Sequence, residues 1–344
     1  MIFDQYRHTS FPSTQFPKLL VDKAKCKGCK RCVEACPIQL LTIVDNKAAS
    51  NERYDAFRCI NCENCMAVCP EKAITIEGDY RVNEGYWKND GLYDNGKIYP
   101  ECLDDNLSND ELTETEFVIY KRRSIRLYKK KQVPKQMVKR VIEAGRFAPS
   151  AGNNQPWKFI VIQNQDTIKK ISQLCHQTLK FATYLSLPHQ WLNKKESNHG
   201  NHDSQSRLAK WQELILPFLV MMYKGDADPR ARGGVNAVTS DPDFDTTFGA
   251  PTLILILSDK RAIGGTELDI GMCTQNMVIT AHAMGLGTCY VGLIDQALKF
   301  HSDFKKSLGI TEPFKIITSL TLGYPKGRID SFVRRDKARI HWID

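Results

Sequence analysis

Eight of the twelve cysteines lie between residues 26 and 69 at regular intervals. The pattern CxxCxxCxxxCP occurs twice, and Cys26, Cys29, Cys32 and Cys36 recur as Cys59, Cys62, Cys65 and Cys69. In such a pattern three thiolates on a tight loop reach three irons, and the distant fourth cysteine completes the other cluster. The spacing therefore predicts two 4Fe-4S clusters, one held by Cys26, Cys29, Cys32 and Cys69 and the other by Cys59, Cys62, Cys65 and Cys36.

Two other uses of these cysteines are less consistent with the sequence. Structural zinc prefers four ligands in CxxC pairs, and two triply spaced runs would overfill such sites. Disulfides belong to exported proteins, but Asp4, Arg7 and His8 interrupt any apolar segment after Met1. The longest apolar run, residues 214–223, is short and broken by Pro217, so we expect neither export nor membrane spanning but a reducing cytoplasm.

The duplicated motif resembles the two-cluster bacterial ferredoxins over residues 18–80, and both motifs are complete. Each copy consists of a cysteine loop, a short helical turn after the third cysteine, a Cys-Pro pair and a short β-prone strand, at residues 41–43 and 74–76. So little apolar sequence cannot build a core unaided, and we expect the clusters to supply the cohesion.

The formal charge of +9 is unevenly distributed. Residues 101–116 include seven acidic side chains and no basic ones, whereas residues 117–147 include eleven Lys or Arg and only Glu143. We therefore predict a linker over residues 81–115, which is also rich in turn signals, and a second domain over 116–344. The basic run has two readings, a solvated helix face or a phosphate site, and nucleic acid is not expected as a partner.

A short motif within this run favours phosphate. The segment Arg122-Arg123-Ser124-Ile125-Arg126 places guanidinium groups and a hydroxyl together, and guanidinium forks match phosphate oxygens. Further along, the small residues of segment 148–157 predict a turn where backbone can approach a planar ring closely.

In combination these motifs resemble the nitroreductase family of FMN enzymes. The segments 285–292 and 323–325, the latter followed by Arg334 and Arg335, extend the resemblance over residues 117–344. The resemblance implies that Arg122, Arg123, Ser124 and Arg126 hold the FMN phosphate, with Arg334 or Arg335 as a further cation. It also implies a homodimer in which Pro149, Ser150, Ala151 and Asn153 reach the ring from the partner subunit, with Tyr290, Val291 and Gly292 on its other side.

The elements that must position these residues follow from the apolar pattern. Pro134 and the apolar stripe after it predict a helix that ends near Gly145, and residues 268–284 predict a longer helix. Strands are predicted at residues 157–162, 251–257, 287–293 and 314–322. We therefore expect an α+β fold, with a nitroreductase-like sandwich of a central mixed sheet flanked by helices, and an insertion at about 180–247.

These features predict an FMN- and iron-sulfur-dependent oxidoreductase that passes electrons from the clusters to FMN and then to a small electron-poor acceptor such as a nitroaromatic or a quinone. The donor is left open between reduced ferredoxin and NAD(P)H, since no GxGxxG fingerprint follows a strand. Two alternatives stay open, a non-catalytic redox relay or sensor and a metabolite-specific flavoenzyme. No histidine or later cysteine is assigned as catalytic.

Overall fold

The computed structural model describes residues 14–15, 17–51, 59, 62–77, 81–82, 112–185, 238–239, 241, 243–327 and 343. The chain divides into two compact units. The unit with fewer described residues, called the smaller unit, has its described parts within residues 14–82, at 181–185 and at 343, and the larger unit has them within residues 112–180 and 238–327. Most of the predicted linker 81–115 and of the predicted insertion 180–247 lies outside the described residues. No described helix is long and apolar enough to cross a membrane.

The smaller unit is built from short strands and two very short helices. Its strands pair antiparallel, β1 with β6, β2 with β5 and β3 with β4, and the last pair is joined by the two-residue turn Asp45-Asn46. Both turn residues have positive φ, as the tight turn of a twisted hairpin requires. The elements are β1 Thr14–Gln15, β2 Lys18–Val21, α2 Arg31–Ala35, β3 Leu41–Val44, β4 Lys47–Ser50, α4 Asn64–Ala67, β5 Ile74–Glu77 and β6 Arg81–Val82.

The duplication seen in the sequence is also present in the backbone. Lys30 and Glu63, at matching positions before α2 and α4, both have positive φ, and so do the matching residues Gln39 and Lys72. Both helices begin just before the third cysteine of their motif, slightly earlier than predicted. The predicted strands at 41–43 and 74–76 are present as β3 and β5.

The larger unit is organised around a four-stranded sheet with the order β7-β8-β10-β9, in which all neighbouring strands pair antiparallel. A mixed sheet includes parallel as well as antiparallel pairing. Parallel pairing occurs here at one isolated bridge, between Ser124 and Thr288 of β9. The strands are β7 Trp157–Ile162, β8 Thr252–Asp259, β9 Gly287–Tyr290 and β10 Phe314–Gly323.

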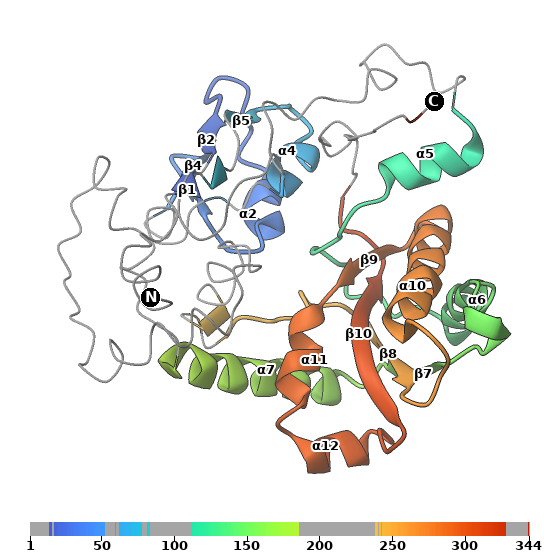
Figure 1. The fold of residues 1–344 in the computed structure, drawn as a ribbon. Coiled ribbons are helices and arrows are strands. Elements are labelled where there is room, and N and C mark those ends of the chain that lie inside the picture. The colour runs from blue at the N-terminus through green and yellow to red at the C-terminus, as the bar shows by residue number, and fades with distance from the viewer. Residues whose placement is uncertain are drawn as a thin grey trace. The chain divides into compact units, whose positions relative to one another are not determined.

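Helices cover both faces of this sheet (Figure 1). Strand β8 shows why, because its apolar residues alternate between two cores: Ile254 and Ile256 pack with α6 and α10, while Leu253 and Leu255 pack with α7 and α11. The predicted α+β fold is therefore confirmed. The helices are α5 Glu114–Lys121, α6 Lys135–Arg146, α7 Gln165–Leu185, α10 Thr266–Ala283, α11 Gly292–Leu298 and α12 Ser302–Ser307, with the 3-10 turn η3 at Ala151–Asn153.

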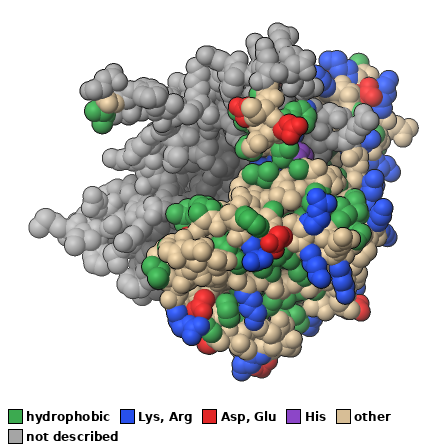
Figure 2. All heavy atoms as spheres, turned by 90° about the vertical axis from the view of Figure 1, so that its right-hand side faces the viewer, with side chains coloured by type: hydrophobic (Ala, Val, Ile, Leu, Met, Phe, Trp, Pro, Cys, Tyr) green, Lys and Arg blue, Asp and Glu red, His purple; other side chains and the backbone are tan. Residues whose placement is uncertain are grey.

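Most predicted elements of this unit occur at their predicted places. Strand β7 has the predicted bounds, and α6 begins directly after Pro134 and buries Val138 and Val141. The predicted strand 287–293 is too long, because β9 ends at Tyr290 and helix α11 begins at Gly292. On the face seen in Figure 2, Lys and Arg side chains lie among hydrophobic and other side chains of the described residues.

Candidate functional site

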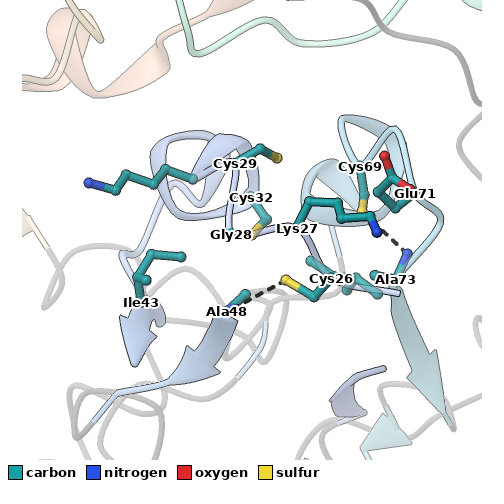
Figure 3. A pocket seen from close by; sticks show the side chains of 12 residues that line it. Cys26, Lys27, Gly28, Cys29, Cys32, Ile43, Ala48, Cys69, Glu71 and Ala73 are labelled. Carbon is teal, nitrogen blue, oxygen red and sulfur yellow. Dashed lines mark hydrogen bonds between the residues drawn. The ribbon is translucent and has the colours of Figure 1, made fainter. Parts of the chain in front are cut away.

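Four cysteines from both sequence motifs line one narrow pocket of the smaller unit. Cys26, Cys29 and Cys32 come from the first cysteine loop and α2, and Cys69 follows α4 in the second motif. Figure 3 shows their sulfur atoms around a common space. The structure thus brings together the four residues predicted to hold the first cluster, including the one contributed by the other repeat.

The backbone around this pocket suits sulfur ligands. The amide N–H groups of Ala48 and Ala73 donate to the Sγ atoms of Cys26 and Cys69, both at 3.3 Å. The first of these bonds is the main reason why the pKa of Cys26 is lowered. In contrast, burial raises the pKa of Cys32 to about 11, with smaller contributions from the other three thiols of the pocket.

The first loop can approach the hairpin after β3 only because residue 28 is glycine. Gly28 has a φ of +65°, and a Cβ atom there would lie 2.1 Å from the carbonyl oxygen of Asn46. The thiols enclose a space and do not converge on one point. Within the described ranges, no three or more His, Cys, Asp or Glu side chains lie close enough together to hold a single metal ion. A four-iron cluster differs, because it needs its thiolates spread around it.

The second set of cysteines is also gathered across the repeats. Burial raises the pKa of Cys65 well above its usual value, and the next largest contributions come from the thiols of Cys62, Cys59 and Cys36. The amide N–H of Leu40 donates to Cys36 Sγ at 3.3 Å, which matches the bond between Ala73 and Cys69 in the other repeat. These four residues are the ones predicted to hold the second cluster.

In the larger unit, the predicted phosphate-binding segment lies beside β9. Ser124 forms the parallel bridge with Thr288, and the N–H of Ile125 donates to the carbonyl of Thr288 at 2.8 Å. A Cβ atom at Gly287 would lie within 2.8 Å of the Ile125 side chain, so glycine is needed for this close approach. Arg122, Ser124 and Arg126 are half-buried, and Arg123 is buried.

The local electrostatics suit an anion. His282, at the end of α10, has a lowered pKa because of burial and because of the positive charges of Arg122 and Lys121. Desolvation raises the pKa of the Tyr290 phenol to about 12, while the charge of Arg122 acts in the opposite direction. The guanidinium of Arg126 lies over the ring of Phe248, 5.7 Å from its centroid. His282 was not assigned from the sequence, and only its position beside these cations reveals it.

The predicted ring-binding residues Pro149, Ser150, Ala151 and Asn153 lie in the turn between α6 and β7, which includes η3. Ser150 Oγ accepts a hydrogen bond from the N–H of Gln155 at 3.0 Å. The N–H of Ala151 donates to the carboxylate of the buried residue Asp269 at 3.4 Å, which fixes the turn to the beginning of α10. This use of Asp269 was also not foreseen.

The fold of this chain does not bring the two predicted halves of the flavin site together. The phosphate segment lies near the end of α10, beside His282, whereas the 149–153 turn lies near its beginning, beside Asp269. Thirteen helical steps between these two residues correspond to about 20 Å. The strands that carry the halves, β7 and β9, also form opposite edges of the sheet. Tyr290, Val291 and Gly292 lie on the phosphate side, and Arg334 and Arg335 lie outside the described residues.

Comparisons with known proteins match both units. A model described as the Nitroreductase family matches residues 119–324, and one described as a 4Fe-4S dicluster domain matches residues 25–83. A protein of Methanothermobacter thermautotrophicus, provisionally named NADH dehydrogenase/NAD(P)H nitroreductase, is 33% identical over 229 residues, which are 64% of this chain and 82% of that protein.

Two further matches are to a curated protein and to a solved structure. The 4-nitrobenzoate reductase of Pseudomonas putida is 27% identical over 209 residues, covering 60% of this chain and 83% of that protein. The second is the crystal structure of a nitroreductase with bound FMN from Bacteroides fragilis. The match covers 68% of this chain and 100% of that chain, with 17% identity and a TM-score of 0.44.

Proposed function

The chain belongs to the nitroreductase family, and we propose that it is an oxidoreductase in which two 4Fe-4S clusters supply electrons to FMN. The observation that carries this proposal is one pocket of the smaller unit. Cys26, Cys29 and Cys32 of the first repeat line it together with Cys69 of the second repeat. When bound, FMN takes up electrons singly and delivers them as a pair, and two clusters together hold the pair that it needs. The protein's own contribution is to bind, orient and shield these groups.

The residues that would hold FMN form two sets. The phosphate would be bound through charge-assisted hydrogen bonds by Arg122, Arg123, Ser124 and Arg126, with Arg334 or Arg335. The positive charges of Arg122 and Lys121 lower the pKa of the nearby His282, which indicates a positive potential in this region. Tyr290, Val291 and Gly292 would line one side of the ring. The phenol of Tyr290, whose pKa is raised, would stay protonated at neutral pH and act as a hydrogen-bond donor.

The second set, Pro149, Ser150, Ala151 and Asn153, would reach the ring from a partner subunit. Two observations support this homodimer. Asp269 beside the turn and His282 beside the phosphate segment are about 20 Å apart along α10. Three apolar side chains close to the turn or to Asp269 in the chain or the fold are also exposed, Phe147 at 79%, Ile263 at 63% and Leu268 at 68%. Large apolar side chains exposed close to a predicted site support an interface there.

We further propose a small electron-poor acceptor such as a nitroaromatic or quinone. The name of the Pseudomonas putida relative, a 4-nitrobenzoate reductase, supports a nitro group as the acceptor. The donor is reduced ferredoxin or NAD(P)H, and the name of the Methanothermobacter relative supports the nicotinamide.

The test is anaerobic purification with iron, sulfide and flavin counted per chain, followed by titration with a one-electron reductant. We expect two clusters and one FMN per chain, and reduction of the flavin absorbance by electrons that first bleach the clusters. Zinc in place of iron, or a chain that binds no flavin, would refute the corresponding half. Electron transfer from clusters to flavin without turnover of nitroaromatics or quinones would favour a redox relay over an enzyme.

A further inference from the structure

Comparing the two cysteine loops with each other shows which charged residues cluster binding does not require. Five cations lie around the first three cysteines, at Lys23, Lys25, Lys27, Lys30 and Arg31. The matching positions of the second repeat hold Ala56, Arg58, Ile60, Glu63 and Asn64, with no net charge. Because both repeats carry complete cysteine motifs, cluster binding does not by itself explain the cations of the first loop.

The local structure explains only some of these cations. Lys23 Nζ donates to the carbonyl of Ala48 at 2.6 Å, and Lys25 forms a 3.3 Å ion pair with Asp22, in which both side chains are largely exposed. Lys27 and Lys30 are exposed and form no ion pair with another described residue. In Figure 3, Lys27 extends along the rim of the pocket toward Cys69 and Glu71. Glu71, also exposed, is the acidic residue among those that line the pocket, and Lys27 and Lys30 line it too. With Lys25 close by in the chain, these three lysines outnumber Glu71 and Asp22, so this face carries a net positive charge.

The same face carries the accessible edge of the first cysteine pocket. Cys29 is exposed, whereas Cys26 and Cys32 are buried, and in the second set Cys59 and Cys65 are buried and Cys62 and Cys36 half-buried. Electron transfer between centres slows steeply as their separation grows. Among the described cysteines, the first set is thus the one with an exposed ligand that an external carrier can contact directly.

On these grounds, and resting on the proposed function above, we propose that Lys25, Lys27 and Lys30 form the docking surface for an acidic one-electron carrier protein, which delivers electrons to the cluster at Cys29. A cluster accepts one electron at a time, whereas a nicotinamide gives up a hydride, so the donor at this edge is a one-electron carrier. In each encounter the carrier is oxidised by one electron and the cluster is reduced by one. Opposite charges accelerate such encounters, and salt screens them.

The test measures how fast a photoreduced acidic 2Fe-2S ferredoxin reduces the clusters of the full-length holoprotein by stopped flow. We expect the bimolecular rate constant to fall about tenfold or more at low ionic strength in the triple variant Lys25→Glu/Lys27→Glu/Lys30→Glu, and its salt dependence to disappear. The matched control is Lys135→Glu/Lys139→Glu/Arg140→Glu, which changes three exposed cations on α6 by the same total charge.

Iron content and reduction by dithionite distinguish the two proposals. Missing clusters, or clusters that dithionite does not reduce, would count against the proposed function. With intact and reducible clusters, an unchanged rate in the loop variant would overturn the docking surface alone. So would an equal loss of rate in the α6 variant, since net charge would then suffice, or a faster rate in the loop variant, since the lysines would then be covered by an acidic segment of this chain.

Discussion

At the scale of single residues, the predicted phosphate site brings Arg122, Arg123 and Arg126 together within five residues. Arg123 is buried, and Arg122 lies close enough to lower the pKa of His282. Elsewhere the basic run has the other role considered from the sequence, because Lys135, Lys139 and Arg140 on α6 are exposed. One run of cations therefore supplies both a candidate anion site and a solvated helix face.

Replacing Arg126 with Ala should weaken FMN binding about tenfold to a hundredfold, because one charge-assisted hydrogen bond to the phosphate is lost. The measurement is the dissociation constant for FMN added to flavin-free protein. The apoprotein should lose only about 0.5–1 kcal/mol of stability, from the contact between Arg126 and Phe248. Arg140→Ala, an exposed change on α6, is the control and should leave FMN binding unaltered. Equal FMN affinity in both variants would show that Arg126 does not contact the phosphate.

His282 should titrate below its usual pKa of 6.5 in the apoprotein, since burial and the charges of Arg122 and Lys121 disfavour the imidazolium. Between the lowered pKa and pH 6.5, His282 is protonated in the unfolded chain but neutral in the folded protein. The neutral imidazole therefore contributes fully to stability above pH 6.5, and this contribution is lost as the pH falls from 6.5 through the lowered pKa. Proton NMR of the His282 ring measures the pKa directly. His282→Gln should flatten the pH dependence of unfolding in this range.

Bound phosphate should raise the pKa of His282, because a nearby anion favours the imidazolium. An NMR titration of His282 with and without FMN tests this expectation. A pKa at or above 6.5 in the apoprotein, or one that FMN leaves unchanged, would place the anion elsewhere.

At the scale of elements, the sequence predicts best where the signal is local. Cysteine spacing and the short apolar runs gave β3, β5, α6 and β7 at or near their places. Helix α11 was missed because residues 287–293 are a short apolar run, which suits a strand or a buried helix alike. Val291 and Ile294 are both buried in the core on the α7 side of the sheet, and that spacing is helical.

Helix α5 was missed for a different reason. The acidic composition of residues 101–116 suggested a linker, although Thr113 and Glu116 form a capping box, a recognisable signal for the start of a helix. The separation of the two flavin-binding sets could not be read from the sequence, since it depends on how α10 and the edge strands are placed. The pairing of Cys69 with the first cysteine loop, by contrast, followed from motif spacing alone.

This pairing across repeats can be tested with two matched double variants. If Cys69 serves the loop of Cys26, then Cys26→Ala/Cys69→Ala should remove one cluster and about half of the iron, whereas Cys26→Ala/Cys36→Ala should remove both clusters. If each repeat holds its own cluster, the two outcomes are reversed. Iron and sulfide analysis with EPR of the dithionite-reduced protein gives the result. Both variants lose two thiols, which controls for general destabilisation.

At the scale of the whole molecule, the flavin site as proposed is complete only in a dimer. Each subunit would contribute its phosphate segment to one site and its 149–153 turn to the other, as a twofold axis requires. The hydrogen bond from Ala151 to the buried residue Asp269 fixes the turn from within its own subunit. The turn would therefore be presented to the partner in a defined conformation.

Mixing two defective variants should then restore flavin binding. Arg126→Ala damages the phosphate segment, and Ser150→Asp/Asn153→Asp places anions in the ring-binding turn, at positions that are half-buried and exposed. Each pure variant has two damaged sites, but a mixed dimer has one intact site and one that is doubly damaged. Unfolding and refolding the two together should regain about a quarter of the flavin sites through random pairing.

The control mixes Arg126→Ala with Ser124→Ala, two changes in the same segment, and should restore nothing, because every site then takes its phosphate segment from a damaged chain. Flavin retained after gel filtration is the measurement, with light scattering to verify the dimer. No gain in the first mixture would mean that one chain builds its whole flavin site. The 149–153 turn would then have to move about 20 Å along α10 to meet the phosphate segment, which its bond to Asp269 and its place beside β7 oppose.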